Sequence, residues 1–89
     1  MHNSYKNITT ATTTTFAGTE ILRVVLASIN INKKLGGTVT INAGSTPIGV
    51  IAAGTDVGQY WYTNHGTAIE DMQIVTSATD NITVFYRNI

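Results

Sequence analysis

Cysteine is absent from this chain of 89 residues, and proline occurs only once. Without cysteine there can be no disulfide, no thiolate metal ligand and no cysteine nucleophile, a composition that is ordinary for a protein made in a reducing cytosol. No apolar run reaches membrane-spanning length, and residues 1–6 lack the apolar stretch of a signal peptide. We therefore expect one soluble domain over residues 1–89, with no membrane partner.

Charged residues are also scarce. They make up 11% of the chain, against about 25% in an average soluble domain, and five basic residues balance five acidic ones. A free monomer normally uses charge to stay soluble and to protect its sheet edges. The scarcity predicts that other subunits cover part of the surface, and the balance argues against a nucleic-acid partner.

Ionisable groups are too few and too scattered to indicate catalysis. Glu70 and Asp71 are adjacent, so on a strand they would point to opposite faces and could not flank one bond. His65 is the one candidate base within the domain, because His2 lies in the terminus. No phosphate-binding glycine motif occurs. We expect no enzymatic activity, no metal and no cofactor.

Threonine, isoleucine and valine dominate what is present, and their branched β-carbons favour strands. Strand-like segments recur about every ten residues, which predicts an all-β fold: a single small antiparallel β-sandwich, jelly-roll-like or Greek-key, with seven to eight short strands. Residues 20–31 satisfy both strand and helix spacing, and their β-branched content favours a strand. The other expected strands are 38–41, 48–51, 59–63, 72–76 and 82–87, the last two forming a hairpin.

The threonine-rich run near the amino terminus is one candidate contact. It comprises Thr12, Thr13, Thr14 and Thr15, followed by Phe16. The run has few large apolar side chains with which to anchor itself, so we expect an edge strand or an arm that pairs with a neighbouring subunit. The alternative is that residues 1–16 form a flexible polar tail.

The aromatic cluster Tyr60, Trp61 and Tyr62 is the other candidate. Strand alternation places the two tyrosines on one face and the tryptophan on the other. In the first interpretation Trp61 fills the core and the tyrosines lie at a subunit interface. In the second, Tyr60 and Tyr62 form a sugar-stacking platform, and Asn64 and His65 supply hydrogen bonds.

Three stretches carry a family resemblance: Gly37–Ile41, Pro47–Ile51 and, above all, Ile74–Arg87. Together with the threonine-rich lead segment they resemble the small all-β structural proteins, decoration or cement and fibre-like, of tailed-bacteriophage virions. The resemblance runs from about Ile8 to the end, whereas residues 66–72 depart from the short glycine-leucine loop expected there.

This resemblance implies a non-enzymatic virion protein, assembled in the cytoplasm of the host bacterium. It would be a capsid decoration or cement protein that self-associates, with a trimer favoured, and that binds the major capsid protein or another virion protein. The alternative is a carbohydrate- or receptor-binding module of a phage fibre or adhesin, with a surface glycan as its partner.

Overall fold

The computed structural model describes residues 3–16, 23–61 and 68–88, and within these it contains nine strands and no helix. In chain order the strands are β1 (Asn3–Ile8), β2 (Thr12–Thr15), β3 (Arg23–Ile31), β4 (Val39–Ala43), β5 (Thr46–Ile51), β6 (Gly58–Trp61), β7 (Ala68–Glu70), β8 (Met72–Thr76) and β9 (Ile82–Asn88).

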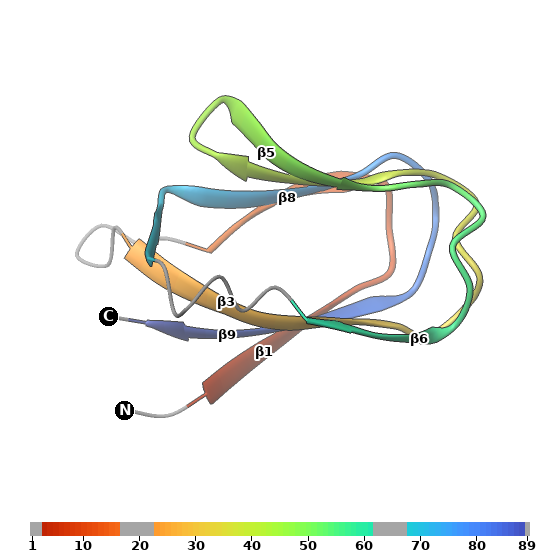
Figure 1. Ribbon diagram of the computed structural model, residues 1–89. Coiled ribbons are helices and arrows are strands. Elements are labelled where there is room, and N and C mark those ends of the chain that lie inside the picture. Colours follow the sequence, from red (N-terminus) through yellow and green to blue (C-terminus); the bar gives the residue numbers. More distant parts are fainter. Residues whose placement is uncertain (1–2, 17–22, 62–67, 89) are drawn as a thin grey trace.

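The strands form two antiparallel sheets that pack face to face (Figure 1). Sheet A has the order β1-β9-β3-β6, with β7 also paired to β3, and sheet B has the order β2-β8-β4-β5. The predicted all-β sandwich is confirmed. The strands not predicted from the sequence are β1, which lies within the expected flexible or exchanged N-terminal arm, and β7, which lies where the chain departs from the expected loop.

The pairing follows a simple rule: strands early in the chain pair with late ones in reverse order. β1 pairs with β9, β2 with β8, β3 with β6 and β7, and β4 with β5. This is one long antiparallel ribbon wrapped into two sheets, the jelly-roll topology. Because β9 occupies one edge of β3, β6 and β7 share the other edge and act as one interrupted strand.

Burial alternates along the strands, as expected when one face of each sheet covers the core. In β8, Met72, Ile74 and Thr76 are buried, and the residues between them are half-buried. In β3 the alternation is shifted by an irregularity between Leu26 and Ser28, which keeps large side chains inward on both sides of it. The strand interpretation of this segment is therefore confirmed for residues 23–31.

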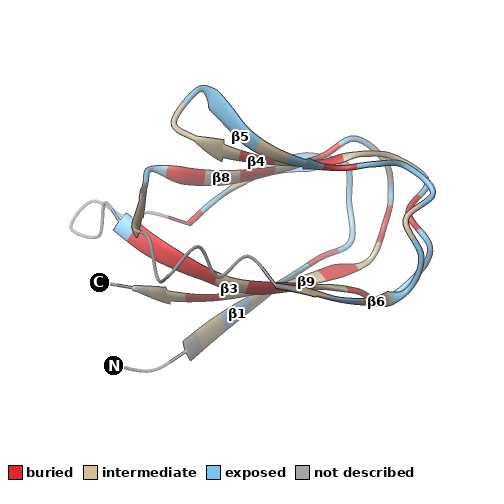
Figure 2. Ribbon diagram, viewed as in Figure 1, coloured by how far each residue is buried: buried red, intermediate tan, exposed pale blue. Residues whose placement is uncertain are grey.

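The core lies between the two sheets, and buried residues occur on strands of both (Figure 2). Phe16 and Tyr86 form an edge-to-face pair within it, with ring centroids 4.9 Å apart and planes at 81°. The side chains with the least exposure come from both sheets: Ile29, Ile31, Ile41, Met72, Ile74, Ile82, Val24, Val39 and Val84.

The predicted hairpin of the last two strands is wrong. β8 belongs to sheet B and β9 to sheet A, so residues 77–81 cross from one sheet to the other. Both strands have one apolar face, and covering both faces at once requires them to oppose each other across the core rather than to lie side by side. A local turn signal does not distinguish these two outcomes.

Asp80 joins this crossing to the one that runs from β3 to β4. Its carboxylate is buried and accepts hydrogen bonds from the backbone N–H groups of Gly36 (2.7 Å) and Gly37 (3.2 Å). A side chain at Gly37 would collide with the Ser77 side chain and with Ala78 Cβ, 2.8 Å away, so only glycine allows this approach.

The true tight hairpin joins β4 to β5. Ala43 pairs with Thr46, which leaves Gly44 and Ser45 as a two-residue loop. Gly44 has φ of 63°, the positive value that a type II′ turn requires at its first central position. This turn brings β5 to the edge of sheet B.

Candidate binding surfaces

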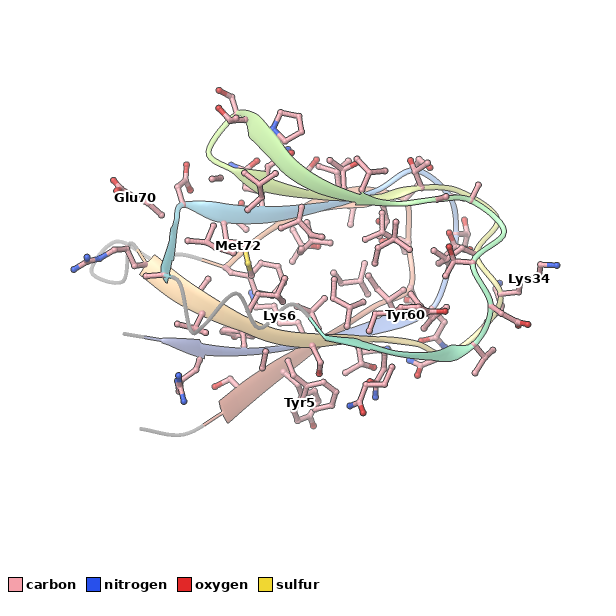
Figure 3. The ribbon with its side chains drawn as sticks, in the orientation of Figure 1. Tyr5, Lys6, Lys34, Tyr60, Glu70 and Met72 are labelled. Atoms are coloured by element: carbon pink, nitrogen blue, oxygen red, sulfur yellow. The ribbon has the colours of Figure 1, made fainter. Side chains whose placement is uncertain are left out.

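Tyr60 is the described member of the predicted aromatic cluster, and it serves the core. It pairs with Ile29, its ring packs against the buried cluster, and its hydroxyl donates to the carbonyl of Asp56 at 3.1 Å (Figure 3). A sugar-stacking platform would need this ring free of the core. The side chain of Trp61, and all of Tyr62, Asn64 and His65, lie outside the described residues.

The threonine-rich run is an edge strand of its own domain. Thr12–Thr15 pairs with Gln73–Thr76 of the same chain, and Phe16 is buried in the core. Thr76 anchors the start of this strand: its hydroxyl donates to the Thr10 carbonyl at 2.6 Å and accepts from the Thr12 N–H at 3.1 Å. No strand among the described residues pairs with the opposite edge of β2, and exchange with a neighbour stays a prediction.

Lys6 closes the side of the sandwich where β1 and β2 lie. Its Nζ donates to the Thr15 carbonyl at 3.2 Å and lies 5.1 Å from the centroid of the Phe16 ring (Figure 3). An open groove beside it is lined by Lys6, Asn7, Ile8, Thr9, Thr10, Thr12 and Thr14. The lysine thus links sheet A to sheet B by a hydrogen bond and a cation–π contact.

The outer face of sheet B is uncharged. Its strands pair so that Thr13, Val75, Thr40 and Val50 form one row across the sheet. The β5 edge exposes Ile48 by 51% and Val50 by 58%. We call this surface the threonine-valine face; it comprises Thr13, Thr15, Thr40, Asn42, Ile48, Val50, Gln73 and Val75, none of which is ionisable.

The outer face of sheet A carries aromatic rings instead. Tyr5 pairs with Phe85, which pairs in turn with Ser28. The rings of Tyr5 and Phe85 are 6.1 Å apart and tilted by 44°, and Tyr5 is 68% exposed (Figure 3). The register continues this row to Trp61. The neighbouring row, on the side toward the start of β1, contains one charged residue, Arg87.

A row of amides and hydroxyls lies on the other side of these rings. It runs through Asn7, Thr83, Asn30 and Gln59 on neighbouring strands. Thr83 Oγ1 accepts from Asn7 Nδ2 at 3.3 Å and from Asn32 Nδ2 at 3.0 Å. Asn81 Oδ1 accepts from the same two amides, at 2.9 and 3.1 Å. We call this row, with Asn32, Asn81 and the Tyr5–Phe85 pair, the ring-amide face.

A shallow hollow lies at the β6 end of the ring-amide face. Its walls are Asn30, Ile31, Asn32, Val57, Gly58 and Gln59. Val57 is 61% exposed there, although it is apolar. Asn30 Oδ1 has no hydrogen-bond partner among the described residues. The hollow therefore combines amide groups with apolar surface.

The acidic residues are spread over the described part of the chain. Glu70 ends β7, and Asp71 follows it in the turn to β8 with φ of 51°, so the two do not share one strand. Within residues 3–16, 23–61 and 68–88 no three His, Cys, Asp or Glu gather as metal ligands would. In the same ranges no helix is long and apolar enough to span a membrane.

No protein-family model, no curated protein and no solved structure matches this chain. The two outer faces are therefore interpreted from their own chemistry. Sequence reasoning missed both as surfaces, because each is assembled from strands that lie far apart in the chain. The signal it could have used is alternation: Tyr5 with Asn7, and Thr83 with Phe85, recur every second residue.

Proposed function

We propose that this chain is a non-enzymatic structural protein of a bacteriophage virion, a capsid decoration protein that self-associates and binds the head lattice. The observation that carries the proposal is the threonine-valine face, which has no ionisable residue and exposes Ile48 and Val50. The resemblance to small virion proteins and the low overall charge support it independently.

A neutral, partly apolar sheet face is less favourable in water than in contact with another subunit. Strand edges and flat apolar faces invite association, and soluble monomers normally protect them with charge. Here the two half-exposed aliphatic side chains of β5 would leave water when another subunit covers them. Covering this face therefore stabilises an assembly without any ion pair.

The β5 edge favours contact through the face of the sheet rather than extension of the sheet. Pro47 lies in β5, opposite Asn42, and has no backbone N–H to give to an added strand. An incoming strand would thus lose a hydrogen bond at that position. Subunits that pack on the face itself avoid this loss, and a threefold arrangement is the assembly we favour.

Attachment to a capsid follows from repetition. Each copy would present a small neutral contact, and many such contacts on a repeating lattice add up to stable binding. Jelly-roll domains occur in viral capsid proteins, but a fold alone does not assign a function. The proposal therefore depends on the surface chemistry. It places the protein in the virion.

The test is the solution mass of the protein, measured by light scattering after size exclusion over a range of concentrations. We expect a discrete oligomer, and we expect Val50→Lys to weaken association at least about tenfold by placing a charge in the covered face. Val57→Lys is the matched control, since this valine is similarly exposed but lies outside the threonine-valine face.

Equal behaviour of the two lysine variants would contradict the assignment of this face. A wild-type protein that stays monomeric at all concentrations, and that does not sediment with phage heads, would contradict the proposed function itself.

A further inference from the structure

We propose that the ring-amide face of sheet A binds a neutral oligosaccharide, with Tyr5 and Phe85 in contact with one sugar ring and the amides of the hollow bound to the hydroxyls of the sugars that follow. This inference does not depend on the proposed function. It concerns the opposite face of the sandwich, and it uses none of the residues first singled out in the sequence around Tyr60.

The rings supply the apolar half of such a site. A sugar presents C–H groups on the faces of its ring, and these pack on aromatic side chains. Tyr5 is 68% exposed although it lies against Phe85, so most of its surface is available to a ligand. An exposed tyrosine on a strand has no role in the core, because Ser4 and Lys6 alternate with it on the inner side.

The amides supply the polar half at a suitable distance. Asn7, Thr83 and Asn30 lie two residues along their strands from the ring row, which corresponds to about 7 Å. That separation suits the span from the face of one sugar ring to the hydroxyls of the next. Amide side chains can both donate and accept, which matches hydroxyl groups.

The hydrogen-bond network holds the amides of Asn7 and Asn32 in fixed orientations before any ligand arrives. Asn7 and Asn32 each donate to both Asn81 Oδ1 and Thr83 Oγ1. Their Nδ2 groups are thus occupied, whereas no donor to their Oδ1 atoms is found within the described residues, so these oxygens can accept from hydroxyl groups. A pre-arranged polar surface loses less conformational entropy when it binds.

The hollow gives the ligand a boundary. Gln59 is exposed at its wall, Val57 adds apolar surface, and Asn30 has a buried Oδ1 atom with no partner among the described residues. A polar atom left without a partner costs free energy that a hydroxyl in the hollow would recover, after a rotation of the Asn30 amide. None of the six residues that line the hollow is charged, which favours a neutral sugar over an acidic one.

The experiment is a printed array of neutral, uronic-acid and sialylated oligosaccharides, followed by titration of the best neutral binder by calorimetry. We expect the wild-type protein to bind neutral oligosaccharides. Tyr5→Ala and Gln59→Ala should each weaken binding by about tenfold or more, while Tyr5→Phe, which keeps the ring, should retain it. Both positions are exposed, so these variants fold, and thermal unfolding of each checks this.

Three results would overturn the inference: no neutral sugar is bound, only acidic sugars are bound, or Tyr5→Ala binds as the wild type does. A fourth is that Tyr5→Ala changes the oligomer mass, which would make this face a subunit contact. Val50→Lys, measured in the same titration, is expected to bind sugar normally. Sugar binding and self-association are thus tested by different variants, so failure of one is distinguishable from failure of the other.

Discussion

The two outer faces of this sandwich have the same backbone geometry and different chemistry. The threonine-valine face is made mostly of short β-branched side chains, among them the exposed Ile48 and Val50, and it also holds the amides of Asn42 and Gln73. The ring-amide face combines a ring pair with amides that are fixed by hydrogen bonds to Asn81 and Thr83. The first suits a flat protein contact, and the second suits a directional polar ligand.

The difference teaches that low charge does not by itself define one kind of surface. Both faces contribute to a chain with 11% charged residues. On sheet B the missing charge leaves a face whose burial gains mainly from the removal of apolar area from water. On sheet A it leaves amides whose hydrogen-bonding groups have directions, so specificity comes from geometry rather than from charge.

The largest expected effect is a loss of stability of the fold that carries both faces. Asp80→Ala deletes the carboxylate that accepts from Gly36 and Gly37 where the two inter-sheet crossings meet. The two part-buried backbone N–H groups then lose a charged acceptor. We expect the free energy of unfolding to fall by roughly 3 kcal/mol. Urea denaturation measures this.

The control for that change is Asp56→Ala. Asp56 is exposed, and within the described residues its carboxylate accepts only from the neighbouring Val57 N–H, so we expect a loss below about 1 kcal/mol. If Asp80→Ala proved as stable as Asp56→Ala, the crossings would not depend on this carboxylate.

A smaller effect concerns the link between the sheets at the β1–β2 side. Lys6→Ala removes the hydrogen bond to the Thr15 carbonyl and the ammonium group over Phe16. We expect a loss of about 1–2 kcal/mol, since a hydrogen bond and a cation–π contact each contribute about 1 kcal/mol or less at a partly exposed site.

Lys6→Met separates the packing of the apolar stem from the two contacts of the ammonium group, because it keeps the stem and loses the charge. It should recover part of the stability that Lys6→Ala loses in thermal unfolding. Equal stability of wild type and Lys6→Ala would mean that the core alone holds the two edges together.

The smallest expected effect is the cross-comparison of the two faces. Tyr5→Ala should leave the oligomer mass unchanged, and Val50→Lys should leave sugar affinity unchanged within about twofold, because the two residues lie on opposite outer faces. Light scattering and calorimetry on the same preparations measure both. Strong coupling in either direction would break the division between the faces.

Much of the secondary structure was predictable from local pattern. The alternation in Val39–Ile41 and in Ile82–Tyr86 predicts strands with one buried face, and the structure has them in β4 and β9. The segment 23–31 was ambiguous by spacing but not by residue type, since branched side chains favour the pleated strand. The strand β1 was missed because Asn3–Lys6 has no apolar alternation, and only its pairing with β9 makes it a strand.

The candidate surfaces were not predictable in the same way. The sequence indicated Tyr60 to Tyr62 because aromatic residues stand next to each other there, but Tyr60 packs on the core. The ring pair that is exposed joins Tyr5 to Phe85, from the first and last strands of the sandwich. Nothing local connects two residues so far apart.

Residue type and alternation by themselves determined that this chain is all-β, neutral and short of ionisable groups, because branched side chains, period-two burial and composition act locally. Only the tertiary structure decided which strands became neighbours, and therefore which side chains share a face. Pairing β1 with β9 and β2 with β8 depends on covering two apolar faces at once, a condition met by the whole chain and not by any one segment.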